Sequence, residues 1–200
     1  MSAPTHPAPT HPEPARPEPA REVTAAFPIR LIALDIDGTI VDDDLVLGPR
    51  TLAAVAAARE RGVAVSLVTG RMTTSARRFA RELGLTDPIV AYQGALVRAL
   101  PPPGADPRLG RILRHRPLAV DAAREVITWA AGVGLAPHVN HLEQFIVQSD
   151  DPRAEDYSTF LGLRAGIVDD LRAWIRHPVS KVLAVSIDPI PESILGDARR

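Results

Sequence analysis

Three short apolar runs alternate with two helical patterns between residues 29 and 92, and this alternation constrains the fold most. Strands are expected at Leu31–Ile36, Val63–Val68 and Ile89–Tyr92, with helices at Pro49–Arg61 and from Thr73 or Thr74 to Leu83. Either threonine could cap the second helix. Nearly continuous apolar strands joined by helices predict a right-handed, parallel, doubly wound sheet whose strands are buried on both faces. The expected fold class is therefore α/β.

Two acidic residues follow the first expected strand, in the segment Asp35-Ile36-Asp37-Gly38-Thr39. Carboxylates at positions i and i+2 of a strand end project to the same side. One carboxylate can attack phosphorus, and the other can protonate the leaving oxygen and then activate water. Two adjacent anions require a cation, and ligation by oxygen alone suits Mg²⁺. The segment therefore predicts Asp35 and Asp37 as catalytic and metal-binding residues.

The glycine and threonine of this segment suit a phosphate. Gly38 lets the backbone turn sharply, and Thr39 supplies a hydroxyl and an N–H. An isolated turn or a fragment of a calcium loop is the alternative interpretation. The apolar strand before the segment and the β-α-β unit that it opens disfavour this alternative.

A second polar segment, Thr69-Gly70-Arg71, closes the next expected strand. A hydroxyl and free N–H groups at the end of a strand can bind phosphate oxygens. In a parallel sheet, chemistry sits at the carboxyl ends of the strands, near the switch point in strand order. The two segments are therefore expected at one edge of the sheet, with Thr69, Gly70 and Arg71 in a phosphate site.

The stretch from Leu31 to Val97, with IALDIDGTIVDDD, VSLVTGR and IVAYQGALV, resembles the Cof-type (subfamily IIB) phosphatases of the haloacid dehalogenase (HAD) superfamily. The resemblance implies a Mg²⁺-dependent phosphatase acting on small phosphorylated metabolites such as sugar phosphates. It implies a HAD-like Rossmannoid core with an inserted α/β cap. In that family pattern Asp35 is the nucleophile, Asp37 the general acid/base and Thr69 a phosphate ligand. The Asp35 carboxylate and the Asp37 main-chain carbonyl would hold Mg²⁺.

The chain departs from the family pattern at its later motifs. Neither the family's third-motif lysine nor its acidic GDxxND segment is recognisable, so the C-terminal part of the core is expected to be missing. Lys181, the only lysine, opens the apolar run KVLAVSID, which predicts a cap strand rather than the helix start of the family lysine. Gln93 stands where the family has asparagine. The alternative function is a catalytically silent chain that only binds a ligand or partner, with Leu31–Ile36 as a sheet edge.

After Gly94 the pattern becomes a mixture of strand pairs and helices. Core residues are expected at 27–95, and an incomplete cap module at 96–200. Cap strands are expected at Leu96–Leu100, Arg111–His115, Leu135–Val139, Gln144–Val147 and Lys181–Ile187, and helices at Leu118–Ala131 and 153–160. The segment His138-Val139-Asn140-His141 lacks further ligands at zinc-like spacing and predicts a hairpin turn facing the substrate. Asp42-Asp43-Asp44 predicts a solvated loop.

Composition sets the remaining expectations. The proline-rich repeats within residues 1–26 predict a disordered tail. The chain has no cysteine, so disulfides and thiolate chemistry are excluded. A net charge of −1 gives no reason to expect a nucleic-acid or membrane-surface partner. No run approaches the roughly 20 apolar residues of a bilayer span, and the N-terminus has no secretion core. A cytoplasmic location is expected.

Overall fold

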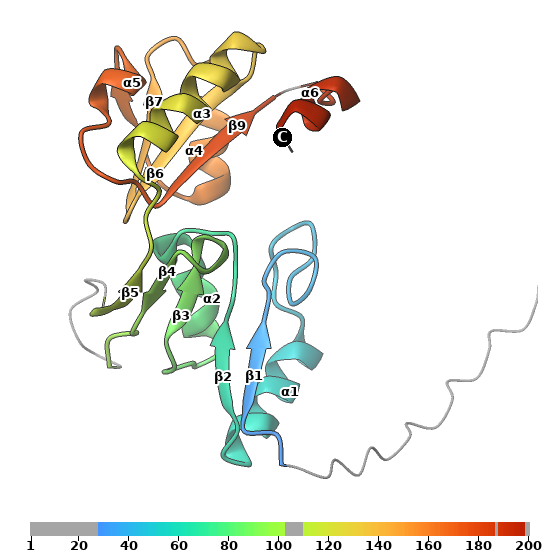
Figure 1. Cartoon of the computed structure of the whole chain (residues 1–200). Coiled ribbons are helices and arrows are strands. Elements are labelled where there is room, and N and C mark those ends of the chain that lie inside the picture. Colours follow the sequence, from blue (N-terminus) through green and yellow to red (C-terminus); the bar gives the residue numbers. More distant parts are fainter. Residues whose placement is uncertain (1–27, 103–109, 187, 199–200) are drawn as a thin grey trace, which may run out of the picture.

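The computed structural model describes residues 28–102, 110–186 and 188–198 (Figure 1). The expected disordered tail at residues 1–26 lies outside the described residues. We call residues 28–115, which hold β1 to β5, the core module, and residues 116–198 the cap module. In Figure 1 the core module forms the lower body and the cap-module sheet, with its helices, the upper one. No helix in the described part of the chain is long and apolar enough to cross a bilayer.

The core module confirms the predicted β-α-β-α-β order. Its elements are β1 (Leu31–Leu34), α1 (Pro49–Glu60), β2 (Ala64–Leu67), α2 (Thr73–Glu82) and β3 (Ile89–Ala91). β1 pairs in parallel with β2, and a parallel bridge between Val68 and Val90 links the end of β2 to β3. The helices begin and end within two residues of the predicted positions.

The expectation that the first strand is buried on both faces is wrong. In β1, Leu31 is 59% exposed, whereas Ile32 and Leu34 are half-buried against the core cluster. Among the described residues β1 pairs only with β2, so its other edge has no partner strand. This agrees with the expectation of a sheet edge. An apolar edge with unpaired backbone groups is a surface that another strand can cover.

Two antiparallel strands extend the core module beyond residue 95. β3 continues through a short 3₁₀ turn (Tyr92–Gly94) into β4 (Leu96–Arg98), which pairs back onto β3. β5 (Ile112–His115) then pairs with β4. Since both strands hydrogen-bond into the sheet that contains β3, we propose the boundary between the modules after β5 rather than at residue 96.

The cap module is built on a four-stranded sheet. Its elements are α3 (Val120–Gly132), β6 (Ala136–His141), β7 (Gln144–Gln148), α4 (Ala154–Leu161), β8 (Gly166–Val168), α5 (Leu171–Trp174), β9 (Lys181–Val185) and α6 (Glu192–Ala198). The strand order is β8-β7-β6-β9, and β7 pairs with β8 in parallel. The predicted hairpin and the predicted strand beginning at Lys181 are confirmed. The short elements β8, α5 and α6 were not predicted.

The two faces of the cap sheet pack into different hydrophobic clusters. Val139 and Ile146 pack into the cap module's own cluster, with residues of α3 and α5. Phe145 and Val147, the alternate residues of β7, belong to the main core cluster. Successive strand residues point to opposite faces. The second face of the cap sheet therefore packs toward the core module, over the carboxyl ends of its strands.

The β6–β7 turn also fastens the cap module to the start of α2. The Glu143 carboxylate accepts a hydrogen bond from the Thr74 N–H at 2.9 Å and another from the Thr74 hydroxyl. Tyr92 donates its hydroxyl to the Leu142 carbonyl. The expectation that Thr73 or Thr74 caps α2 is wrong, because the N-cap is Met72 and makes no side-chain cap bond. A carboxylate from the cap module satisfies the free N–H instead.

Candidate functional site

The two predicted polar segments meet at the same edge of the sheet. Asp35 and Asp37 lie just beyond β1 and are exposed, whereas Ile36 between them is fully buried. The Ile36 carbonyl accepts hydrogen bonds from the N–H groups of the next turn, those of Thr39, Ile40 and Val41, at 3.1–3.3 Å. This turn passes through Gly38 at φ +68°, a conformation that favours glycine. Gly38 and Thr39 are exposed on it.

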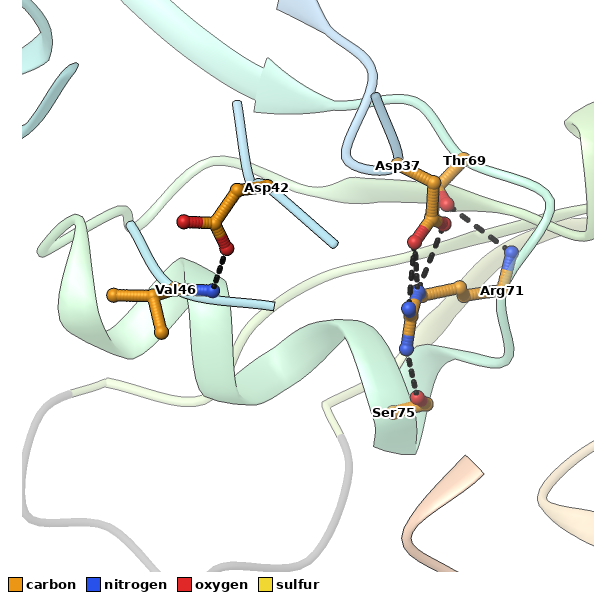
Figure 2. A network of polar contacts seen from close by, with 6 residues as sticks. All are labelled: Asp37, Asp42, Val46, Thr69, Arg71 and Ser75. Atoms are coloured by element: carbon orange, nitrogen blue, oxygen red, sulfur yellow. Dashed lines mark hydrogen bonds and ion pairs between the residues drawn. The ribbon is translucent and has the colours of Figure 1, made fainter. Parts of the chain in front are cut away.

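Arg71 forms a bidentate ion pair with Asp37 (Figure 2). Its Nε lies 2.9 Å from Oδ2 and 3.1 Å from Oδ1, and Nη2 lies 2.6 Å from Oδ1. The Arg71 side chain is 3% exposed and the Asp37 side chain 45% exposed. Arg71 also donates from Nη1 to the Ser75 hydroxyl at 3.2 Å and lies 5.5 Å from the centre of the Phe79 ring. Arg71 is therefore the anchored partner, and Asp37 the accessible one.

The loop that carries Arg71 is braced by the segment after β3. Thr69 is buried; its N–H donates to the Val90 carbonyl at 2.9 Å, and its carbonyl accepts from the Gln93 N–H at 3.1 Å. The Thr69 hydroxyl accepts from the Arg71 N–H at 3.1 Å. A Cβ added at Gly70 would lie 2.5 Å from Gln93 Nε2. Only glycine at position 70 leaves room for the amide of Gln93 in its present place.

Residues of both modules line a cavity of about 120 Å³ at this edge. The lining residues are Asp37, Gly70, Arg71, Met72, Asn140, Tyr157 and Lys181. The cap module holds a larger cavity of about 350 Å³ beside His141 and Trp174, which contains neither polar segment. The smaller cavity is the candidate active site because it alone of the two joins the acidic and phosphate-site segments.

Of the three cap-module residues of this cavity, Lys181 and Tyr157 were not predicted as site residues, whereas Asn140 lies in the segment expected to face the substrate. Lys181 Nζ donates to the Gly70 carbonyl at 3.3 Å, and burial lowers the pKa of Lys181. Asn140 contacts the Met72 sulfur from Nδ2 at 3.6 Å. Burial raises the pKa of Tyr157. Two sequence signals pointed to Lys181. It is the only lysine of the chain, and it begins an expected strand, on the face opposite Val182.

The expected hairpin turn at His138–His141 is wrong in position. These residues lie within β6, and the turn falls at Leu142 and Glu143. His138 is fully buried, and its Nε2 lies 2.5 Å from Asp151 Oδ2. Desolvation lowers the pKa of His138 although Asp151 acts in the opposite direction. Within the described residues no group of three or more histidine, aspartate or glutamate side chains could hold a metal ion.

The Asp42–Asp44 loop is exposed, as predicted for a solvated loop. Asp42 Oδ1 accepts from the Val46 N–H at 2.9 Å (Figure 2). This hydrogen bond lies within the loop and does not involve the Asp37–Arg71 ion pair.

The donor set at the end of β1 fits a magnesium ion. The exposed Asp35 carboxylate and the Asp37 main-chain carbonyl are both oxygen donors, the type that Mg²⁺ prefers. Mg²⁺ commonly keeps several waters and takes only one or two protein carboxylates, together with substrate phosphate. Two protein oxygens at an exposed strand end are compatible with that preference.

Comparisons with known proteins agree with this architecture. A family model described as haloacid dehalogenase-like hydrolase matches residues 32–188, and the chain therefore belongs to this family. A haloacid dehalogenase-like hydrolase from Bacteroides thetaiotaomicron superposes with a TM-score of 0.65 at 20% identity, covering 80% of this chain and 59% of that one. This likeness confirms the fold, and the family match confirms the resemblance carried by the two polar segments.

Two curated relatives are phosphatases by name. A 5-amino-6-(5-phospho-D-ribitylamino)uracil phosphatase from Bacillus subtilis is 33% identical over 97 residues, which are 48% of this chain and 34% of that protein. An HMP-PP phosphatase from Cronobacter sakazakii is 27% identical over 157 residues, 78% of this chain and 54% of that protein. The chain thus spans between a third and a little over half of the length of these relatives.

Proposed function

We propose that the protein is a Mg²⁺-dependent phosphatase that hydrolyses small phosphorylated metabolites through an aspartyl-phosphate intermediate. The observation that carries the proposal is the pairing of Asp37 with Arg71 at a small cavity at the carboxyl edge of a parallel sheet. Asp35 stands two residues before Asp37 at the same strand end. The phosphatase names of the relatives support the same reaction class.

In this reaction the Asp35 carboxylate attacks phosphorus, and the bond from phosphorus to the ester oxygen breaks. Asp37 gives its proton to the leaving oxygen and then takes a proton from the water that attacks the phosphoaspartate. That attack releases inorganic phosphate and restores both carboxyl groups. Their positions at i and i+2, on either side of the buried Ile36, point them to one side for these two roles.

The remaining residues bind the phosphoryl group. Thr69 and Gly70 close β2 beside Arg71, while Gly38 and Thr39 offer main-chain N–H groups and a hydroxyl in the turn after β1. Arg71 is the cation that pairs with Asp37 at the cavity wall. Mg²⁺, held by Asp35 and the Asp37 carbonyl, would neutralise charge on the transferred group.

The cavity also limits the substrate. Its volume of about 120 Å³ admits a small group, and its cap-module side presents Lys181, Asn140 and Tyr157. A cation, an amide and a phenol favour a leaving group rich in hydroxyl or other oxygen atoms over an apolar one. A sugar-phosphate-like ester suits these features.

The test is substitution of the nucleophile. Asp35→Asn should abolish hydrolysis of a panel of sugar phosphates and also the acid-stable labelling of the protein by a ³²P-phosphorylated substrate, because an amide cannot attack phosphorus. Asp121→Asn removes one carboxylate from an exposed position of α3 and is the matched control, which should retain both signals. Turnover by the Asp35→Asn protein near the level of the control would exclude Asp35 as nucleophile.

A binding protein without turnover is the second candidate. It is favoured by the finding that no third acidic side chain joins Asp35 and Asp37 in a metal group among the described residues. The same assay separates the two functions. A protein that binds inorganic phosphate but shows no turnover and no labelling with Asp35 intact would be the binding protein.

A further inference from the structure

The ion pair between Asp37 and Arg71 conflicts with the role proposed for Asp37. Both carboxylate oxygens of Asp37 accept hydrogen bonds from the one guanidinium, at 2.6–3.1 Å. An acid/base must have an oxygen free to carry a proton to the leaving group. Resting on the proposed function, we infer that Arg71 holds Asp37 in a resting position and exchanges it for the substrate phosphate, which releases Asp37 for proton transfer.

Arg71 is the partner that stays in place during such an exchange. Its side chain is 3% exposed, donates to Ser75 and packs near Phe79. Its main chain is tied to the Thr69 hydroxyl and to the Tyr92 N–H, which donates to the Arg71 carbonyl at 3.1 Å. Moving this guanidinium would break several contacts inside the core.

Asp37 is the partner that can move. Its side chain is 45% exposed and sits at the start of the exposed turn through Gly38. Among the described residues the Asp37 side chain hydrogen-bonds to Arg71, so a rotation toward the cavity breaks that ion pair and leaves the packing of the core in place. The asymmetry in burial therefore assigns the motion to the carboxylate.

Phosphate is the stronger ligand for the position that Asp37 now occupies. A guanidinium presents two parallel N–H groups that match either a carboxylate or a phosphate, and a phosphate dianion carries more negative charge. Lys181, whose Nζ lies 3.3 Å from the Gly70 carbonyl, adds a second cation to the same cavity. A bound phosphate would also repel the Asp37 carboxylate from Arg71. Binding of substrate and release of the acid/base thus become one event.

The inference is tested by a double-mutant cycle with inorganic phosphate as the probe. Affinity is measured by isothermal titration calorimetry at a fixed Mg²⁺ concentration for the parent protein, Asp37→Asn, Arg71→Gln and the double variant. With Arg71 intact, Asp37→Asn should bind phosphate more tightly than the parent, on the order of tenfold. This is the effect expected from one charge-assisted hydrogen bond. In the Arg71→Gln background the same change should give less than about a twofold gain.

The outcomes separate exchange from simple charge repulsion. Equal tightening in both backgrounds would mean that Asp37 only repels phosphate, and no tightening in the parent would mean that the pair does not compete with it; either result overturns the exchange. Parent protein that binds no phosphate would overturn the proposed function together with the exchange, whereas the first two results leave that function standing.

Two further variants protect the cycle against a folding defect. If Arg71→Gln does not melt cooperatively, Arg71→Lys serves as the background, because lysine keeps the charge but lacks the planar fork. The gain from Asp37→Asn should then fall below about threefold, and a full tenfold gain would overturn the inference. Asp121→Asn, an exposed carboxylate on α3, is the charge control and should leave phosphate affinity unchanged.

Discussion

Loss of the Glu143 carboxylate should weaken the attachment of the cap module to the core module. Glu143 accepts two hydrogen bonds from Thr74 at the start of α2, and its Oε1 lies 3.7 Å from Arg98 Nε. Both ion-pair side chains are largely buried, 18% exposed for Glu143 and 9% for Arg98. The carboxylate therefore accepts hydrogen bonds at a helix N-terminus and also forms an ion pair, without a hydrogen bond, with a buried cation.

The magnitude follows from these contacts. Loss of an acceptor at a helix start costs about 1 kcal/mol, and loss of a negative charge near that end costs about 0.3–1 kcal/mol. Loss of the ion-pair partner of the buried Arg98, which keeps its hydrogen bond to the Gly110 carbonyl, adds about 1 kcal/mol. Glu143→Ala should thus lower the free energy of unfolding by about 2–3 kcal/mol. For a chain of this size each kcal/mol corresponds to about 2–4 °C in melting temperature, so a fall of roughly 4–12 °C is expected.

The assay is thermal unfolding followed by circular dichroism. Glu143→Gln keeps an acceptor oxygen without the charge and should lose about half as much as Glu143→Ala. Glu125→Ala, an exposed position of α3, is the matched control and should change the melting temperature by less than about 1 °C. If Glu143→Ala melts at the same temperature as Glu125→Ala, the contacts of Glu143 with Thr74 and Arg98 contribute nothing to stability, and the reasoning is refuted.

Three other predictions concern pH, the cavity and the sheet edge. Burial lowers the pKa of His138, so the unfolded chain binds this proton more readily, and the free energy of unfolding should fall as the pH drops below about 6.5. In urea titrations from pH 8 to 5, the free energy of unfolding of His138→Gln should fall less steeply than that of the parent. An equally steep fall in both proteins would exclude His138 as a source of the pH dependence. Lys181→Ala should raise the KM for a phosphate ester about tenfold with less effect on kcat, and Lys181→Arg should have a KM close to that of the parent. An equal rise in KM in both variants would exclude a role for the charge of Lys181. Leu31→Lys places a charge on the exposed edge of β1 and should reduce concentration-dependent association in sedimentation velocity, whereas association equal to that of the parent would mean that this edge is not the contact.

Local pattern was sufficient for the order of elements in the core module. Apolar runs of strand length, Pro49 at a helix start and Gly62 or Gly84 after a helix end are signals that act over a few residues. The parallel pairing of β1 with β2 and the placement of both polar segments at one edge followed from that order. The exposed Asp35 and Asp37 flanking the buried Ile36 likewise follow from the two-residue period of an extended chain.

Contacts between distant segments could not be read from such patterns. The pairing of β4 with β3 and of β5 with β4 depends on which strand edge is free, so the change of pattern at residue 96 could not predict these partners. The exposure of β1 depends in the same way on the absence of a second partner strand among the described residues. The cap of α2 comes from Glu143, 69 residues away, and no local signal could name it.

The sequence by itself determined which residues stand at the strand ends, and it suggested the chemistry that we propose for them. Tertiary structure decided their partners: Asp37 meets Arg71 across 34 residues, and Lys181 meets Gly70 across 111. The physical reason is range. Backbone periodicity sets the direction of a side chain within one element, whereas an ion pair or a cavity wall requires two elements to be packed at a fixed distance, and that packing is a property of the whole core.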